Sequence, residues 1–70
     1  MTRRAIADLR HKIEHSGGIY DSRVYRYVFG RDGQIYKVKL SVLDTAAVYN
    51  SWTTLRGKPI DRQTAKEIIF

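Results

Sequence analysis

The sequence contains no cysteine and a single proline, and its longest apolar runs are only a few residues. Without cysteine, neither a disulfide nor a cysteine-based zinc site can stabilise the chain. Apolar runs this short exclude a membrane-spanning helix, and the first residues lack the apolar core of a signal peptide. We therefore expect a cytoplasmic protein that has no membrane partner.

Seventy residues suffice for one domain, which we place at residues 1–70. This length is close to the size at which a single core barely outweighs the entropy of the chain. The apolar cluster Ile68, Ile69 and Phe70 is expected to seal either the core of its own domain or a two-fold interface. Because dimerisation is the remaining way to stabilise a small chain that lacks cysteine, the sequence favours a homodimer.

The clearest structural signal lies in residues 23–42, where two β-prone runs meet at Asp32-Gly33. This dipeptide is typical of a two-residue hairpin turn of type I′. A turn centred on these residues predicts an apolar face that pairs Phe29 with Tyr36, Tyr27 with Val38 and Tyr25 with Leu40. The other face pairs Val28 with Lys37, Arg26 with Lys39 and Val24 with Ser41. A shift of one residue would mix apolar and basic side chains on both faces, so we expect the first register.

Capping residues and apolar spacing indicate three helices around this hairpin. The first helix begins after Thr2 and stops at Gly17-Gly18, and a short third helix follows Asp61. The second helix is capped by Asp44 or Thr45, carries the apolar stripe Val48, Trp52 and Leu55, and ends at Gly57, with Trp52 as a packing anchor.

The fold class predicted from this pattern is α+β. We expect a small single domain with an N-terminal helix, an antiparallel β-hairpin, a second helix and a short C-terminal helix. A third strand starting at Ile19 and Tyr20 is an open alternative, because a hairpin alone is marginally stable. The helices are expected to cover Tyr25, Tyr27 and Phe29, since little else remains to build a core. Burial of these rings is therefore favoured over their presentation to nucleotide bases.

The formal net charge is +6, and residues 23–40 hold five basic side chains against Asp32 alone. A field of this sign attracts polyanions, although a basic surface that only keeps the protein soluble is the alternative. We expect a non-enzymatic nucleic-acid-binding or regulatory protein that contacts DNA or RNA through the outer face of the hairpin. The candidate binding residues are Arg26, Lys37 and Lys39 on that face, Arg23 and Arg31 at its ends, and Arg3 and Arg4 on the first helix.

Catalysis and cofactors are not indicated. Residues His11 to His15 match the inverted zinc-protease motif H-x-x-E-H, but that chemistry needs a third protein ligand and a substrate cleft. Only Glu67 remains as a downstream glutamate, and seventy residues cannot easily build the cleft. We therefore expect no metal site and no cofactor. A metal-free ribonuclease that uses His11 or His15 as general base is a weaker alternative. The runner-up function is a protein-interaction module, such as a small inhibitor or adaptor, in which the hairpin edge or the Ile68 to Phe70 cluster binds an acidic partner.

Overall fold

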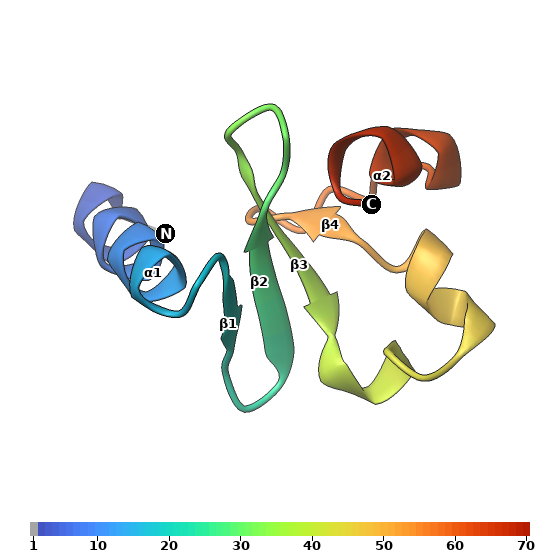
Figure 1. The fold of residues 1–70 in the computed structure, drawn as a ribbon, viewed down its shortest axis with the longest axis horizontal. Helices are drawn as coiled ribbons and strands as arrows, with labels where there is room; N and C mark the ends of the chain where they lie inside the picture. Colours follow the sequence, from blue (N-terminus) through green and yellow to red (C-terminus); the bar gives the residue numbers. More distant parts are fainter. Residues whose placement is uncertain (1) are drawn as a thin grey trace.

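The computed structural model describes residues 2–70 and contains a four-stranded antiparallel sheet between two layers of helical structure (Figure 1). The strands lie in sequence order, and helix α1 packs on one face of the sheet while α2 and two short 3₁₀ helices pack on the other. The α+β class predicted from the sequence is confirmed. The elements are α1 Arg3–His15, β1 Ile19–Asp21, β2 Tyr25–Phe29, β3 Ile35–Lys39, the 3₁₀ helices η1 Leu40–Val42 and η2 Ala46–Asn50, β4 Thr53–Thr54 and α2 Arg62–Ile68.

Helix α1 begins and ends where its capping residues predict. The Thr2 hydroxyl accepts a hydrogen bond from the backbone N–H of Ala5, which satisfies one free donor of the first turn. At the other end, the N–H of Gly18 bonds to the carbonyl of Ile13, and the N–H of Gly17 bonds to that of Glu14. This is the Schellman arrangement, which needs the positive φ of 74° found at Gly17.

The predicted register of the β2–β3 hairpin is wrong by one residue. Phe29 pairs with Ile35, Tyr27 with Lys37, and Arg26 with Val38. The N–H of Gly33 bonds to the carbonyl of Gly30, and the N–H of Gly30 bonds to the carbonyl of Gln34. The loop therefore has three residues, 31 to 33: a type I turn followed by Gly33 in the left-handed region at φ 81°. A type I′ turn would need positive φ at Asp32 as well, and Asp32 does not have it.

Side chains at the turn explain why the longer loop forms. The Asp32 carboxylate accepts hydrogen bonds from the N–H of Gln34 and from the hydroxyl of Tyr36, at 3.1 and 2.5 Å. The Tyr36 ring lies against Gly30, where a Cβ atom would come within 2.6 Å of Tyr36 Cε2. Glycine at position 30 thus allows Tyr36 to pack over the turn, and the extra loop residue shifts every cross-strand pair by one.

Two further strands complete the sheet. β1 confirms the third strand expected at Ile19 and Tyr20, and β4 pairs with β3 through Tyr36–Thr54 and Lys37–Thr53. The second helix predicted from Asp44 or Thr45 to Gly57 is wrong, because its first part is the 3₁₀ helix η2 and its last part is β4. Trp52, at 3% exposure, is the packing anchor that we predicted, although it lies outside any helix.

Each face of the sheet builds its own core. On one face, Leu9 and Ile13 of α1 bury Ile35 together with Tyr27 and Phe29. On the other face, Val28, Tyr36 and Val38 pack against Trp52 and Ala65, and Ile68 and Ile69 join this core. The expectation of one free basic face is therefore wrong, since helical elements cover part of both faces. The C-terminal residues 68 and 69 seal the core of their own domain, the first of the two alternatives considered for them.

Candidate nucleic-acid interface

The observed register redistributes the basic side chains of the hairpin. Side chains alternate between faces along a strand, so residues that pair directly lie on the same face. Lys37 pairs with Tyr27, and Lys39 pairs with Tyr25, which places both lysines on the face that carries the tyrosines. Arg26 pairs with Val38 and lies on the opposite face. The expected grouping of Arg26 with Lys37 and Lys39 is therefore wrong.

A row of paired residues crosses all four strands on the tyrosine face. Tyr20 of β1 pairs with Tyr27 of β2, Tyr27 with Lys37 of β3, and Lys37 with Thr53 of β4. Tyr25 and Lys39 form the next pair along β2 and β3. We call this set the tyrosine–lysine surface; its members are Tyr20, Tyr25, Tyr27, Lys37 and Lys39, with Lys12 contributed by α1.

The rings of this surface contact one another and the neighbouring ammonium groups. Tyr20 stacks on Tyr27 with 6.3 Å between ring centroids, and Tyr25 lies 6.2 Å from Tyr27. The Nζ atom of Lys37 lies 4.6 Å from the centroid of the Tyr25 ring, and that of Lys12 lies 5.7 Å from the Tyr20 centroid. Both contacts are cation–π interactions, which hold positive charge next to the aromatic faces.

The surface remains accessible because α1 covers only one end of this face. The core under α1 includes Tyr20, Tyr27 and Phe29 as partly buried members, whereas Tyr25 lies beyond it. Tyr20, Tyr25, Tyr27 and Lys37 are all half-buried, and Lys39 is exposed. The expectation that the helices cover Tyr25, Tyr27 and Phe29 therefore holds for Tyr27 and Phe29, which pack under α1, but not for Tyr25. Tyr20 and Lys12 were not among the predicted site residues, since Tyr20 reaches this surface through the pairing of β1 with β2 and Lys12 through the position of α1 beside Tyr20.

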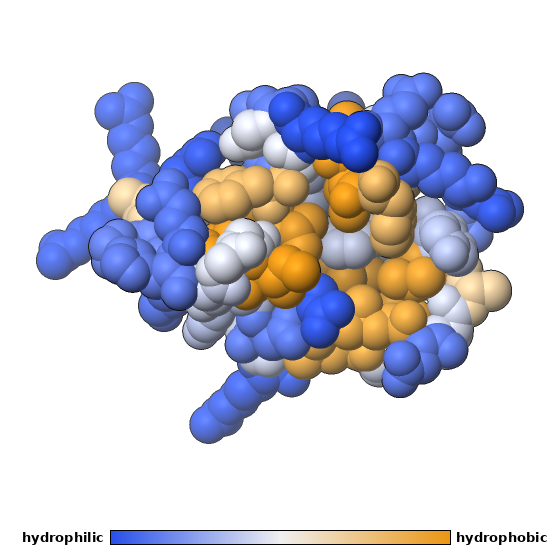
Figure 2. Space-filling model, viewed as in Figure 1, coloured by the Kyte–Doolittle hydropathy of each residue, from blue (hydrophilic) through white to orange (hydrophobic). Residues whose placement is uncertain are grey.

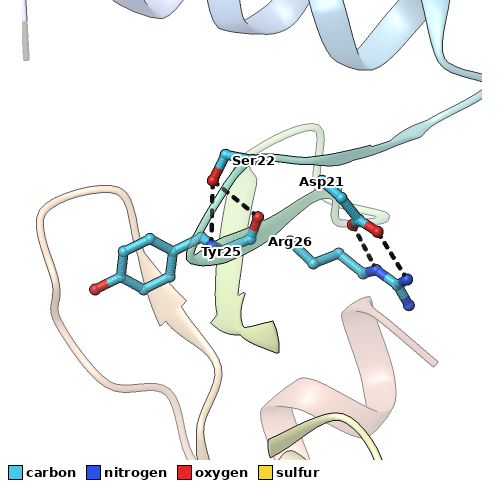
Figure 3. Close-up of polar contacts among 4 residues, drawn as sticks. All are labelled: Asp21, Ser22, Tyr25 and Arg26. Carbon is cyan, nitrogen blue, oxygen red and sulfur yellow. Dashed lines mark hydrogen bonds and ion pairs between the residues drawn. The ribbon is translucent and has the colours of Figure 1, made fainter. Parts of the chain in front are cut away.

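Arg26 has a different environment, which Figure 3 shows. Its side chain leaves β2 on the side opposite to Tyr25 and makes a two-pronged ion pair with Asp21 of β1, at 2.8 and 3.0 Å. The hydrogen bond from Arg26 lowers the pKa of Asp21, and the same bond raises the pKa of Arg26. The Arg26 side chain is about one-third exposed, but its charge is already matched by a carboxylate.

The remaining predicted residues do not converge on one site. Arg23 is exposed in the β1–β2 turn, two residues from Tyr25. Arg31 lies at the opposite end of the hairpin, where its guanidinium donates to the carbonyl of Phe70 at 3.5 Å. Arg3 and Arg4 are exposed in the first turn of α1. Of the seven predicted residues, only Lys37, Lys39 and Arg23 lie on or beside the tyrosine–lysine surface.

The histidines give no sign of a metal centre. His11 and His15 lie one helical turn apart on α1, with ring centroids separated by 4.1 Å, and both are exposed. Within residues 2–70, no group of three or more histidine, aspartate or glutamate side chains is placed to hold a metal ion. In the same residues, no helix combines the length and the apolar character that crossing a membrane requires.

Comparisons with protein-family models, with curated proteins and with solved structures give no match to this chain. A function for this chain must therefore follow from the chemistry of its own residues.

Proposed function

We propose that the protein binds single-stranded nucleic acid through the tyrosine–lysine surface. The observation that supports this is the register of strands β1 to β3, which places three half-buried tyrosines and two lysines on one partly open face. Bases stack on aromatic rings, and ammonium groups neutralise the phosphates between them. This function retains the polyanion partner inferred from the sequence but uses a different set of residues.

A single strand fits this surface better than a duplex does. Stacking requires bases whose faces are exposed, and these are available in single strands, loops and ends. Reading of a duplex major groove by a hairpin requires a two-stranded ribbon that can enter the groove. Here β2 and β3 are flanked by β1 and β4, so the hairpin is the centre of a sheet and not a projecting ribbon.

The energies of the contacts favour base stacking over the existing arrangement. A base that stacks on Tyr25 displaces the Lys37 ammonium from the ring, at a cost of about 0.5–1 kcal/mol for an exposed cation–π contact. Base–aromatic stacking contributes roughly 1–3 kcal/mol. The displaced Lys37 is then free to contact a phosphate, so ring and cation both take part in binding.

The test is fluorescence anisotropy with labelled oligo(dT), oligo(U) and a mixed-sequence duplex, each measured at several salt concentrations. Tyr25→Ala should weaken single-strand binding by about 5- to 150-fold, the equivalent of one lost stacking contact. Tyr25→Phe should bind like the parent, because the ring and not the hydroxyl carries the contact. Lys37→Gln and Lys39→Gln should each reduce the slope of log affinity against log salt by about 0.7.

Two matched controls separate this surface from general basicity. Arg4→Gln removes a charge from α1, and Arg26→Gln removes one from the opposite sheet face, so both should change binding much less than Lys39→Gln. Circular dichroism of each variant checks that the fold is retained. If the folded triple variant Tyr25→Ala, Lys37→Gln, Lys39→Gln binds all three nucleic acids as the parent does, this function is wrong.

A further inference from the structure

A second open region lies on the other face of the sheet. A groove of about 780 Å³ runs over β1 and β2 and is bounded by η1, η2 and the C-terminal residues. Its apolar walls include Ile19, Leu43, Val48 and Phe70, and Figure 2 shows hydrophobic surface gathered in the middle and right of this view. Four large apolar side chains of the described residues are exposed, and three of them line this groove: Ile19, Tyr49 and Phe70, at 50%, 39% and 52% exposure.

The groove lies beside a sheet edge that presents backbone hydrogen-bonding groups. β1 is the first strand in the sheet order, so one of its edges faces away from β2. The N–H of Ser22 bonds to the carbonyl of Tyr25, which makes Ser22–Tyr25 a hydrogen-bonded pair. Because such pairs alternate along an antiparallel ladder, Tyr20–Tyr27 is the next one, and the N–H and carbonyl groups of Ile19 and Asp21 point outward.

The side chains of these two residues lie on the groove side of the sheet. Ile19 pairs with Val28 and Asp21 with Arg26, and both partners line the groove. A strand added at this edge would therefore place two of its own side chains on the groove face, two residues apart, opposite Ile19 and Asp21.

The charges in and beside the groove indicate which side chains a partner strand should carry. Its walls carry Arg26 and Asp44, and Asp21 forms an ion pair with Arg26 at the edge. Asp44 makes no ion pair with Arg26 but is near enough for its charge to raise the pKa of that guanidinium, so two carboxylates lie around one cation. The residue opposite Asp21 is thus favoured to be basic, whereas the residue opposite Ile19 is favoured to be apolar. A second copy fits poorly, because the antiparallel self-pairing that uses all three residues of β1 sets Ile19 opposite Asp21. Each copy also carries a net charge of +6.

We propose that β1 and this groove bind an extended segment of a partner protein, in which a large apolar residue and a lysine or arginine are separated by one residue. The segment adds a fifth strand to the sheet, its apolar side chain enters the groove, and its basic side chain contacts Asp21 and Asp44. This inference does not depend on nucleic-acid binding, because it uses the opposite sheet face.

The test is selection of binders from a displayed library of random ten-residue peptides, with the full chain as the immobilised target. We expect the selected peptides to share an apolar residue and a basic residue two positions apart. Ile19→Lys should weaken binding of these peptides by at least about tenfold, since it removes the apolar contact and places a positive charge near the basic residue of the peptide. Val24→Lys is the matched control: Val24 is 53% exposed but lies outside the groove, so this variant should bind the peptides like the parent.

A further variant tests the charge preference. Asp44→Lys should reduce binding of the same peptides and shift a repeated selection from basic toward acidic residues at that position. Selection that yields no binders, or binders that lack the pattern or are insensitive to Ile19→Lys, would overturn the proposal. Sedimentation equilibrium tests whether a second copy of the chain occupies the groove instead. A dimer that Ile19→Lys dissociates would assign the groove to that second copy and would also overturn the proposal.

Discussion

Replacement of Gly30 by alanine is expected to be among the more damaging small changes in the hairpin. A Cβ atom at position 30 would lie 2.6 Å from Tyr36 Cε2 and 2.6 Å from Asp32 Oδ1. The Tyr36 ring is only 6% exposed and packs against Val38 and Trp52, so it cannot simply move away. The Asp32 carboxylate is exposed and can rotate, but rotation breaks its hydrogen bonds to Gln34 and Tyr36.

The magnitude follows from three terms. Over-packing against a buried side chain costs about 1–3 kcal/mol, and a weakened hydrogen bond adds roughly 0.5–1.5 kcal/mol. Alanine restricts the unfolded chain more than glycine does, which offsets about 0.4–1 kcal/mol. We therefore expect Gly30→Ala to lower the free energy of unfolding by about 2 kcal/mol, equivalent to a fall in Tm of about 8–16 °C for a domain of this size.

Urea unfolding followed by Trp52 fluorescence measures this change, since Trp52 is buried in the same core as Tyr36. Gly33→Ala is the comparison: nothing lies within 4 Å of its Cβ position, so its cost of about 1–2 kcal/mol is that of a positive φ alone. Gly33→Asn should recover part of that loss, because asparagine tolerates this conformation. In the double variant Gly30→Ala, Tyr36→Val, the two effects should be less than additive, because the clash with the Tyr36 ring is gone. Full additivity, or a Gly30→Ala variant as stable as the parent, would refute the turn geometry.

Three further outcomes are expected, from a side-chain hydrogen bond, an ion pair and a helix cap. The hydrogen bond to Asp32 raises the pKa of Tyr36 to about 12, so tyrosinate absorbance should include one late transition that Tyr36→Phe removes. Because the folded pKa exceeds the unfolded value of about 10, this contribution to stability is complete below that pH and is lost as the pH rises through about 12. The ion pair with Arg26 lowers the pKa of Asp21, so Asp21 should stabilise the fold above about pH 4 and lose this effect on acidification. Asp21→Asn should lower the free energy of unfolding in urea by less than about 1 kcal/mol, because the pair is exposed. Thr2→Ala should lower the free energy of unfolding by about 1 kcal/mol, whereas Thr2→Ser should leave it nearly unchanged.

The starts of both α-helices and the end of the first were predictable from the sequence because they depend on neighbours only a few residues away. Thr2 accepts a bond from the N–H three residues later, and Asp61 does the same with Thr64. Gly17 and Gly18 close the first helix through carbonyls of its last turn. Such signals are local, so a linear reading of the chain finds them.

The segment from 44 to 55 was misread because its apolar residues serve two different cores. Val48, Trp52 and Leu55 have helical spacing, which predicts one stripe on one helix. In the fold, Val48 and Trp52 belong to the core under α2, whereas Leu55 belongs to the core under α1. A single helix cannot reach both sides of the sheet, so the chain passes through β4 instead. The existence of two cores, which only the tertiary structure reveals, therefore decides that this segment does not form one helix.

The hairpin register, and with it the candidate site, was likewise decided by tertiary structure. The dipeptide Asp32-Gly33 is compatible with a loop of two residues or of three, and the choice rests on Tyr36 packing over Gly30. The sequence by itself determined that the chain is a small basic α+β domain with a hairpin at its centre. Since one residue of register exchanges the two faces of a strand, the fold alone determined that Lys37 and Lys39 join the tyrosines while Arg26 joins the groove on the other side.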